Sequence, residues 1–153
     1  MEKTITYRLA KNTDIQSIKC IYDSNIDKLH GVFRSEYEWE EILESNPNHY
    51  VVIVEKTIVG WFRVDFENDK IFLGMLQVDP NYHKQGIGTN ILNVFENIAA
   101  ANNHEETFVH TTKDNEAAIR FYLKNNYRII SEEECQTADG VTRQGLTLRK
   151  KKE

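Results

Sequence analysis

The sequence contains few of the residues that build disulfide-rich or metal-dependent proteins. It has 2 cysteines and 2 prolines in 153 residues, and Cys20 and Cys135 are too few and too far apart for a disulfide framework. Such cysteine usage is typical of a reducing cytosol, and we expect Cys20 to be packed within a helix. None of the five histidines has metal-ligand spacing to a cysteine or another histidine, so no bound metal is expected.

Long apolar runs and an excess of positive charge are also absent. No apolar run approaches the roughly 18 residues of a membrane span. The first residues form no signal-peptide core, so we expect a cytoplasmic protein without membrane contact. The net charge of -5 and the pI near 5.6 give no general attraction for phosphate backbones, which argues against nucleic acid as a partner. The acid excess favours cationic small molecules or basic peptides instead.

The remaining composition is that of a globular domain. The hydrophobic fraction is 40% and the charged fraction is 28%, which are ordinary values for folded proteins. A chain of this length fits one domain, 1–153, and buries roughly 68–70% of its unfolded surface without needing disulfides. The sequence leaves open whether the protein is a monomer or a homodimer.

Hydrophobic periodicity predicts an α+β fold with the order β-α-α-β-β-β-α-β-α-β-β. One helix follows Asp14 and another follows Asp114, and two more cover 36–45 and 86–101. The segment 71–78 is apolar almost throughout, which predicts a central strand covered on both faces. The predicted strands cover 4–9, 50–54, 58–66, 71–78, 107–111, 127–131 and 141–148.

The most informative unit is the predicted strand, turn and helix of 71–101. A helix start has unpaired backbone N–H groups and a partial positive charge. Gly86 and Gly88 leave those donors open to an anion, while His83, Lys84 and the hydroxyl of Thr89 add polar groups. The pattern predicts a cradle for a phosphate or pyrophosphate, although the glycines of a plain helix entry could serve packing alone. It is not a Walker A loop, because no Lys-Ser/Thr pair follows the second glycine.

Two blocks of sequence resemble the GNAT superfamily of N-acetyltransferases. The first, Leu76-Gln77-Val78-Asp79-Pro80-Asn81-Tyr82-His83-Lys84-Gln85-Gly86-Ile87-Gly88-Thr89, is similar to its acetyl-CoA signature, with His83 where the family usually has Gln or Arg. The second, 114–127, is similar to its N-x-x-A-x-x-F-Y-x-K-x-G-F/Y block, with Asn126 in place of the usual glycine. The resemblance implies a central mixed, mostly antiparallel sheet of about six to seven strands flanked by about four helices.

The resemblance also implies acetyl-CoA as a co-substrate and no metal. In the family the pantetheine arm lies in a gap beside the central strand, near a bulge, and bonds to backbone at positions matching Leu76 and Val78. The pyrophosphate lies on the N–H groups of 85–89. The resemblance therefore implies these cofactor-binding residues: Leu76, Gln77, Val78, His83, Lys84, Gln85, Gly86, Ile87, Gly88, Thr89, Asn115 and Tyr122.

The same resemblance suggests two catalytic residues. Tyr122 matches the tyrosine that protonates the departing CoA thiolate, and Asn115 lies two helical turns before it on the same face. Alternatively, Tyr122 is a tyrosine packed in the core and Asn115 only caps its helix. His110 is a candidate base, because it ends a predicted strand five residues before Asn115 and an imidazole can accept an amine proton near neutral pH. Its alternative is a histidine hydrogen-bonded within the sheet.

These interpretations predict an N-acetyltransferase that transfers an acetyl group directly from acetyl-CoA to a primary amine of a small molecule or peptide. Two alternatives remain at this point, a CoA-binding regulatory module without turnover and an unrelated phosphate-ligand binding domain. The acidic residues of 36–45 favour a cationic acceptor, or they form a solvated helix face. The identity of the amine and the preferred acyl chain stay open.

Overall fold

The computed structural model describes residues 3–152, and its strands form a seven-stranded sheet in the order β1-β2-β3-β4-β5-β7-β6. Neighbouring strands are antiparallel apart from the pair β4 and β5, which is parallel. This confirms the predicted mixed and mostly antiparallel α+β sheet. The strands are β1 Ile5–Leu9, β2 His49–Val54, β3 Thr57–Glu67, β4 Lys70–Val78, β5 Glu106–Thr112, β6 Arg128–Gln136 and β7 Thr142–Lys151.

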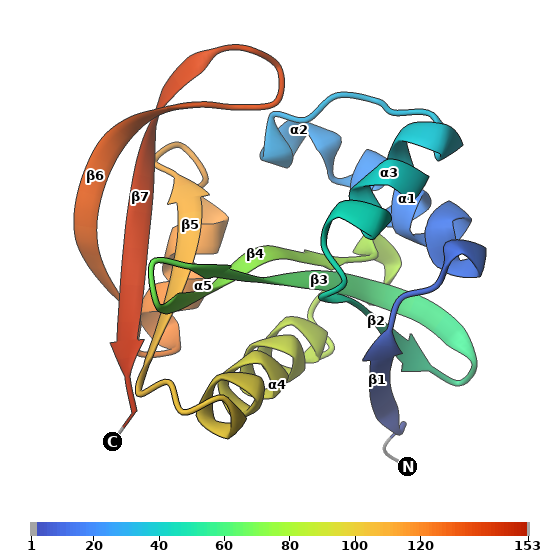
Figure 1. Ribbon diagram of the computed structural model, residues 1–153, viewed down its shortest axis with the longest axis horizontal. Coiled ribbons are helices and arrows are strands. Elements are labelled where there is room, and N and C mark those ends of the chain that lie inside the picture. Colours follow the sequence, from blue (N-terminus) through green and yellow to red (C-terminus); the bar gives the residue numbers. More distant parts are fainter. Residues whose placement is uncertain (1–2, 153) are drawn as a thin grey trace.

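Helices cover both faces of the sheet. The helices α1, α2 and α3 lie on one face, and α4 and α5 lie on the other (Figure 1). The periodicity missed α2, because a helix of four residues is too short to show a repeat. No helix within residues 3–152 is long and apolar enough to cross a membrane. The helices are α1 Ile15–Ser24, α2 Ile26–Leu29, α3 Glu36–Ser45, α4 Ile87–Ala101 and α5 Glu116–Lys124.

Side-chain alternation along the central strands builds two cores. Val51 of β2 packs with Trp39 and Trp61 under α1 and α3, whereas its neighbour Val52 packs with Phe62 under α4 and α5. Successive residues of a strand point to opposite faces, so an apolar run buries side chains on both. In β4, Ile71 and Leu73 belong to the core under α4 and α5 and Met75 packs against the core under α1 and α3, which confirms the prediction that this strand is central and covered on both faces.

The predictions for Cys20 and for β6 differ from the structure. Cys20 is exposed, because the helical repeat that buries Ile18 and Ile21 turns Cys20 toward solvent. The strand β6 extends to Gln136, beyond the predicted end at Ser131. Residues 132–134 are glutamates with low strand propensity, yet they pair with β7 across the sheet.

The sheet separates between β4 and β5. Their parallel register includes only two pairs, Phe72 with Phe108 and Leu73 with Val109. Beyond them the strands separate. In Figure 1, β3 and β4 lie roughly horizontally, whereas β5 and β7 lie roughly vertically.

A bulge in β4 explains where the separation begins. Arg63 pairs with Met75 and the next residue of β3 pairs with Leu73, so Gly74 is an extra residue in β4. A side chain at 74 would collide with the ion pair that Arg63 and Asp65 form across the bulge, with N–O distances of 2.8 and 2.9 Å. Glycine therefore permits the bend that turns β4 away from β5.

Candidate active site

A cavity of about 440 Å³ opens where β4 and β5 separate. Its walls come from both of these strands, from α5, from β6 and β7, and from α2. It brings together five of the predicted site residues, which are Leu76, Gln77, His110, Asn115 and Tyr122.

The backbone of β4 directs toward this gap groups that do not pair with β3. The N–H of Asp79 donates to the carbonyl of Val59 at 2.8 Å, so these two residues form a hydrogen-bonded pair of the β3–β4 ladder. Such pairs alternate with pairs whose backbone groups point outward. The register therefore directs the N–H and C=O of Leu76 and Val78 away from β3, toward the gap.

The edge of β5 across the gap also has backbone groups that point away from the neighbouring strand, which is β7 here. The N–H of Lys113 donates to the carbonyl of Gln144 at 2.9 Å, which makes this a hydrogen-bonded pair in register with the β5–β7 ladder. By the same alternation, the backbone groups of His110 and Thr112 point away from β7 and into the gap, where the Thr112 carbonyl accepts the N–H of Asn115 at 3.0 Å. Two strand edges that do not pair with each other thus face each other across the cavity, which is an arrangement that accepts an extended amide-bearing chain.

The predicted phosphate cradle lies beside this gap. Gly86 has φ +78° and precedes α4, and no side-chain hydrogen bond caps that helix among the described residues. No atom lies within 4 Å of the position where a Cβ on Gly86 would lie, so the space beside this glycine is open. The first helical bond runs from the N–H of Asn90 to the carbonyl of Gly86, which leaves the N–H groups of 87–89 for a ligand.

The cradle is next to the cavity rather than inside it. None of residues 83–89 lines the 440 Å³ space. The link is Leu76, which lines the cavity and comes within 4.0 Å of the position where a Cβ on Gly88 would lie. Lys84 has φ +64°, and the ring of His83 turns back to the carbonyl of Val78.

Asn115 and Tyr122 both reach the cavity from α5, as their spacing predicts. The side-chain carbonyl of Asn115 also accepts the N–H of Ala118 at 3.2 Å. Asn115 therefore caps α5, and it lines the cavity at the same time. The side chain of Tyr122 is 7% exposed, and burial raises its pKa above the usual range. The phenol is therefore protonated at neutral pH and available as a donor.

His110 lies at the rim of the cavity with its ring exposed. Its Nδ1 is 3.0 Å from the hydroxyl of Thr147, and the ring stacks on Phe72 with centroids 4.6 Å apart. The predicted hydrogen bond within the sheet is therefore present. If Nδ1–H donates to Thr147, Nε2 is free to accept a proton.

The two candidate catalytic side chains approach the gap from opposite faces of the sheet. Val109 and Leu148 are buried in the same core as Tyr122. His110 follows Val109 along β5, so its side chain points to the other face, where α2 lies. A group held in the gap could therefore meet a proton acceptor on one side and a proton donor on the other.

Comparison with known proteins identifies the family. The family model described as "Acetyltransferase (GNAT) family" matches residues 16–127. The chain belongs to the GNAT family of acetyltransferases. It is therefore an acyltransferase, and the interpretation as an unrelated phosphate-ligand binding domain is wrong.

Solved structures share the GNAT fold over nearly the whole chain. Ard1 from Thermoplasma volcanium is 18% identical with a TM-score of 0.81, covering 97% of this chain and 98% of its own. The Salmonella typhimurium acetyltransferase that modifies the N-terminal serine of ribosomal protein L7/L12 is 14% identical with a TM-score of 0.84, covering 98% and 96%. The Salmonella typhimurium protein yncA, solved with acetyl-CoA, is 14% identical with a TM-score of 0.75, covering 98% and 95%.

On the α2 side, the GNAT cavity has walls that the sequence did not indicate. Lys28 and Leu29 of α2 lie on one side, and Glu133, Cys135 and Gly145 of the β6–β7 hairpin lie on the other. The register places Gly145 directly between β5 and Glu133, and a Cβ on Gly145 would lie 2.9 Å from Cys135 Sγ, so the missing side chain makes room for Cys135 over the sheet. No sequence signal could have shown these neighbours, because they meet only through strand register.

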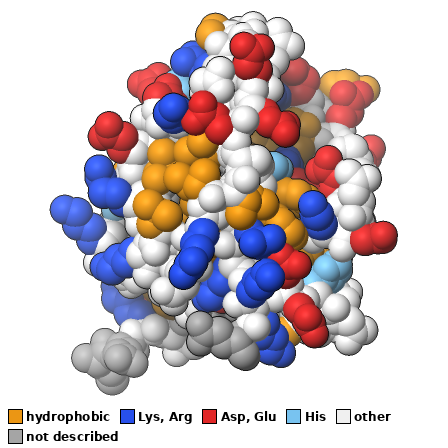
Figure 2. Space-filling model, turned by 90° about the vertical axis from the view of Figure 1, so that its left-hand side faces the viewer, with side chains coloured by type: hydrophobic (Ala, Val, Ile, Leu, Met, Phe, Trp, Pro, Cys, Tyr) orange, Lys and Arg blue, Asp and Glu red, His pale blue; other side chains and the backbone are white. Residues whose placement is uncertain are grey.

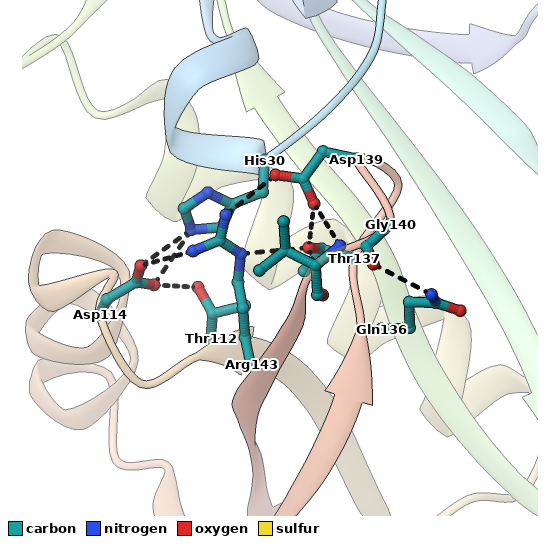
Figure 3. A network of polar contacts seen from close by, with 9 residues as sticks. His30, Thr112, Asp114, Gln136, Thr137, Asp139, Gly140 and Arg143 are labelled. Carbon is teal, nitrogen blue, oxygen red and sulfur yellow. Dashed lines mark hydrogen bonds and ion pairs between the residues drawn. The ribbon is translucent and has the colours of Figure 1, made fainter.

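A network of polar contacts joins these walls at the rim of the cavity (Figure 3). His30 at the end of α2 has Nε2 2.9 Å from a carboxylate oxygen of Asp114, and its carbonyl accepts the N–H of Asp139 at 3.1 Å. Arg143 bonds Asp139 at 2.9 Å and lies 3.7 Å from Asp114. The hydroxyl of Thr112, and then His30, lower the pKa of the Asp114 carboxyl.

Charge is unevenly distributed on the surface formed by β6 and β7. Asp and Glu side chains gather in the upper half of this surface, toward the hairpin tip, while Lys and Arg gather below (Figure 2). On β6 the exposed residues 132–134 are all glutamates, whereas the strand starts with Arg128. Within residues 3–152, no group of three or more His, Cys, Asp or Glu side chains is placed to hold a metal ion.

Proposed function

We propose that this acyltransferase moves an acetyl group from acetyl-CoA directly to a primary amine of a small molecule or peptide. The observation that carries the proposal is that the edges of β4 and β5 face each other across the cavity without pairing, next to an open helix N-terminus. The fold match to yncA, which was solved with acetyl-CoA, supports the choice of donor.

The described residues fit acetyl-CoA in two separate places. The cradle of 86–89 offers backbone donors with no side chain in front of Gly86, and Lys84 adds a positive charge nearby. The backbone of Leu76 offers a donor and an acceptor to the amides of a pantetheine arm lying in the gap. Bound there, acetyl-CoA would supply the thioester from which the acetyl group is transferred.

The chain's own part in the transfer is to move protons and to hold the reactants. As the N–C bond forms and the C–S bond breaks, the amine loses a proton and the sulfur gains one. His110 Nε2 accepts the amine proton from the α2 side, and the Tyr122 hydroxyl donates to the leaving sulfur from the other side. The phenol is then reprotonated from solvent.

The acceptor is proposed to enter between α2 and the β6–β7 hairpin. The cavity wall there includes Glu133 and Glu134, and the carboxylates gathered near the hairpin tip favour a cationic group (Figure 2). One structural neighbour modifies the N-terminal serine of ribosomal protein L7/L12, and this supports including peptides among the candidate acceptors.

The experiment is an assay of thiol release from acetyl-CoA over a panel of diamines, amino sugars, amino acids and short peptides, with calorimetry of acetyl-CoA binding. We expect binding and amine-dependent release, with release strongly reduced in Tyr122→Phe. Binding of CoA without release for any amine would favour the regulatory-module alternative. No binding by protein stripped of copurified CoA would refute both.

A further inference from the structure

One backbone oxygen at the end of β4 accepts hydrogen bonds from two side chains. The carbonyl of Val78 accepts from Asn25 Nδ2 at 3.1 Å and lies 3.0 Å from His83 Nε2. Asn25 comes from the junction of α1 and α2, and His83 comes from the turn that leads to Gly86.

The direction of this carbonyl matters for the gap. The register of β3 and β4 turns the backbone groups of Val78 away from β3, on the same side as those of Leu76. A carbonyl oxygen has two lone pairs, and Asn25 and His83 use both. Of the groups that Val78 presents to the gap, only the N–H is left for a ligand.

Asn25 is itself firmly held. Its side chain is buried, at 8% exposure, and its amide also donates to the carbonyl of Ile21 at 3.2 Å. Both amide hydrogens therefore have acceptors, one in α1 and one in β4. A buried amide with both bonds made fixes the distance between the α1–α2 junction and the strand end.

His83 completes the arrangement from the other side. It follows a short 3-10 helix, Pro80–Tyr82, and its ring folds back to the strand that the turn has just left. Because Val78 offers only an acceptor, the bond requires a proton on Nε2 of His83. The contact gives the side chain at this position a structural role at the end of β4.

We propose that Asn25 and His83 are positioning residues for acetyl-CoA. They hold the Val78 carbonyl between them, so that the Val78 N–H stays directed at the pantetheine arm. The inference rests on the proposed function, and it assigns His83 to the strand end rather than to the phosphates.

The test compares two substitutions of His83 by calorimetry of acetyl-CoA binding. His83→Leu has no donor, whereas the amide of His83→Gln can donate to the same carbonyl. We expect about tenfold weaker binding for the Leu variant, which corresponds to one hydrogen bond, and binding within about threefold of wild type for the Gln variant. His104→Leu, on the α4–β5 loop, is the control for a general effect of losing a histidine.

A second probe separates the strand end from the phosphates. Adenosine 3′,5′-bisphosphate carries phosphates but no pantetheine arm, so His83→Leu should bind it as wild type does. Asn25→Leu should weaken acetyl-CoA binding but leave the affinity for the bisphosphate unchanged. In steady-state assays the KM for acetyl-CoA should rise in His83→Leu, while kcat and the KM for the amine stay unchanged.

The outcomes distinguish this inference from the proposed function. If wild-type protein does not bind acetyl-CoA, the proposed function fails. If wild type binds and the Leu and Gln variants bind equally, only the positioning role is overturned. The positioning role is also overturned if His83→Leu weakens binding of the bisphosphate as much as binding of acetyl-CoA, because the ring would then contact phosphate directly.

Discussion

Gly86 offers the sharpest test of the phosphate cradle, because the chain contains a matched control. Gly86 has φ +78° and Gly140 has φ +83°, and at neither position would a Cβ meet an atom within 4 Å. Alanine at either site therefore has the same free-energy cost from its left-handed backbone conformation, and its methyl group collides with no atom of the protein. Gly86 precedes the open N-terminus of α4, whereas Gly140 lies in the turn between β6 and β7.

The expected magnitudes follow from these two observations. A side chain in the left-handed region costs about 1–2 kcal/mol, which lowers Tm by about 2–8 °C in a domain of this size. Acetyl-CoA at a hundred times its Kd stabilises the folded state by about 2.7 kcal/mol, or about 5–11 °C. Gly86→Ala and Gly140→Ala should therefore lose similar Tm without ligand. Only Gly86→Ala should lose most of the ligand-induced rise, because its methyl group occupies the space before the backbone donors.

Differential scanning fluorimetry with and without acetyl-CoA measures both effects on one plate. Equal ligand-induced rises in the two variants would refute the cradle at 86–89. Loss of the rise in both variants would show that the left-handed strain, and not the place of the methyl group, prevents binding.

Three further predictions concern Tyr122, His110 and His49. Tyr122→Phe should lower kcat by roughly 10²–10⁴-fold with the Kd for acetyl-CoA nearly unchanged, and wild-type turnover in that variant would make the tyrosine a packing residue. Since burial raises the pKa of Tyr122, the wild-type pH–rate profile should show no limb from it near neutral pH. His110→Gln should lower kcat/KM, because it removes the proton acceptor, while moving Tm by at most about 2 °C, because the ring is exposed; an unchanged kcat/KM would leave His110 a surface residue. Burial lowers the pKa of His49 to about 4, so between about pH 6.5 and 4 the unfolded chain binds a proton that the native state does not. Urea titrations should therefore show the free energy of unfolding falling by about 3 kcal/mol as pH drops through that window, and His49→Gln should remove this decline.

The local parts of the site were predictable from sequence. The strand, turn and helix of 71–101 are contiguous, and the glycines that shape the helix entry lie two residues apart. Asn115 and Tyr122 share one face of one helix, so their joint place in the cavity followed from the helical repeat. The boundaries of α3 were also predicted, because its apolar period and the proline after it are local signals.

The remaining features depend on register and on distant contacts. The bulge at Gly74 lies against an ion pair on the neighbouring strand, and no pattern within β4 indicates it. Asn25 meets Val78 across 53 positions of sequence, and His30 meets Asp114 across 84. Such pairs arise only when α2, β4 and the β6–β7 hairpin have taken their places in the fold.

The short parallel pairing of β4 with β5 has a consequence for how the protein opens. Within residues 3–152, only two strand residue pairs join the half-sheet β1–β4 to the half-sheet β5–β7–β6, and the core beneath α4 and α5 and the contacts of His30 with Asp114 and Asp139 add to the connection. Elements linked so sparsely tend to behave as separate cooperative units in native-state hydrogen exchange. The amides of β2 and β3 should then exchange with one common free energy, and those of β5 and β7 with another. A pantetheine arm bonded across the gap would act as a missing strand, and its binding should bring the two free energies together.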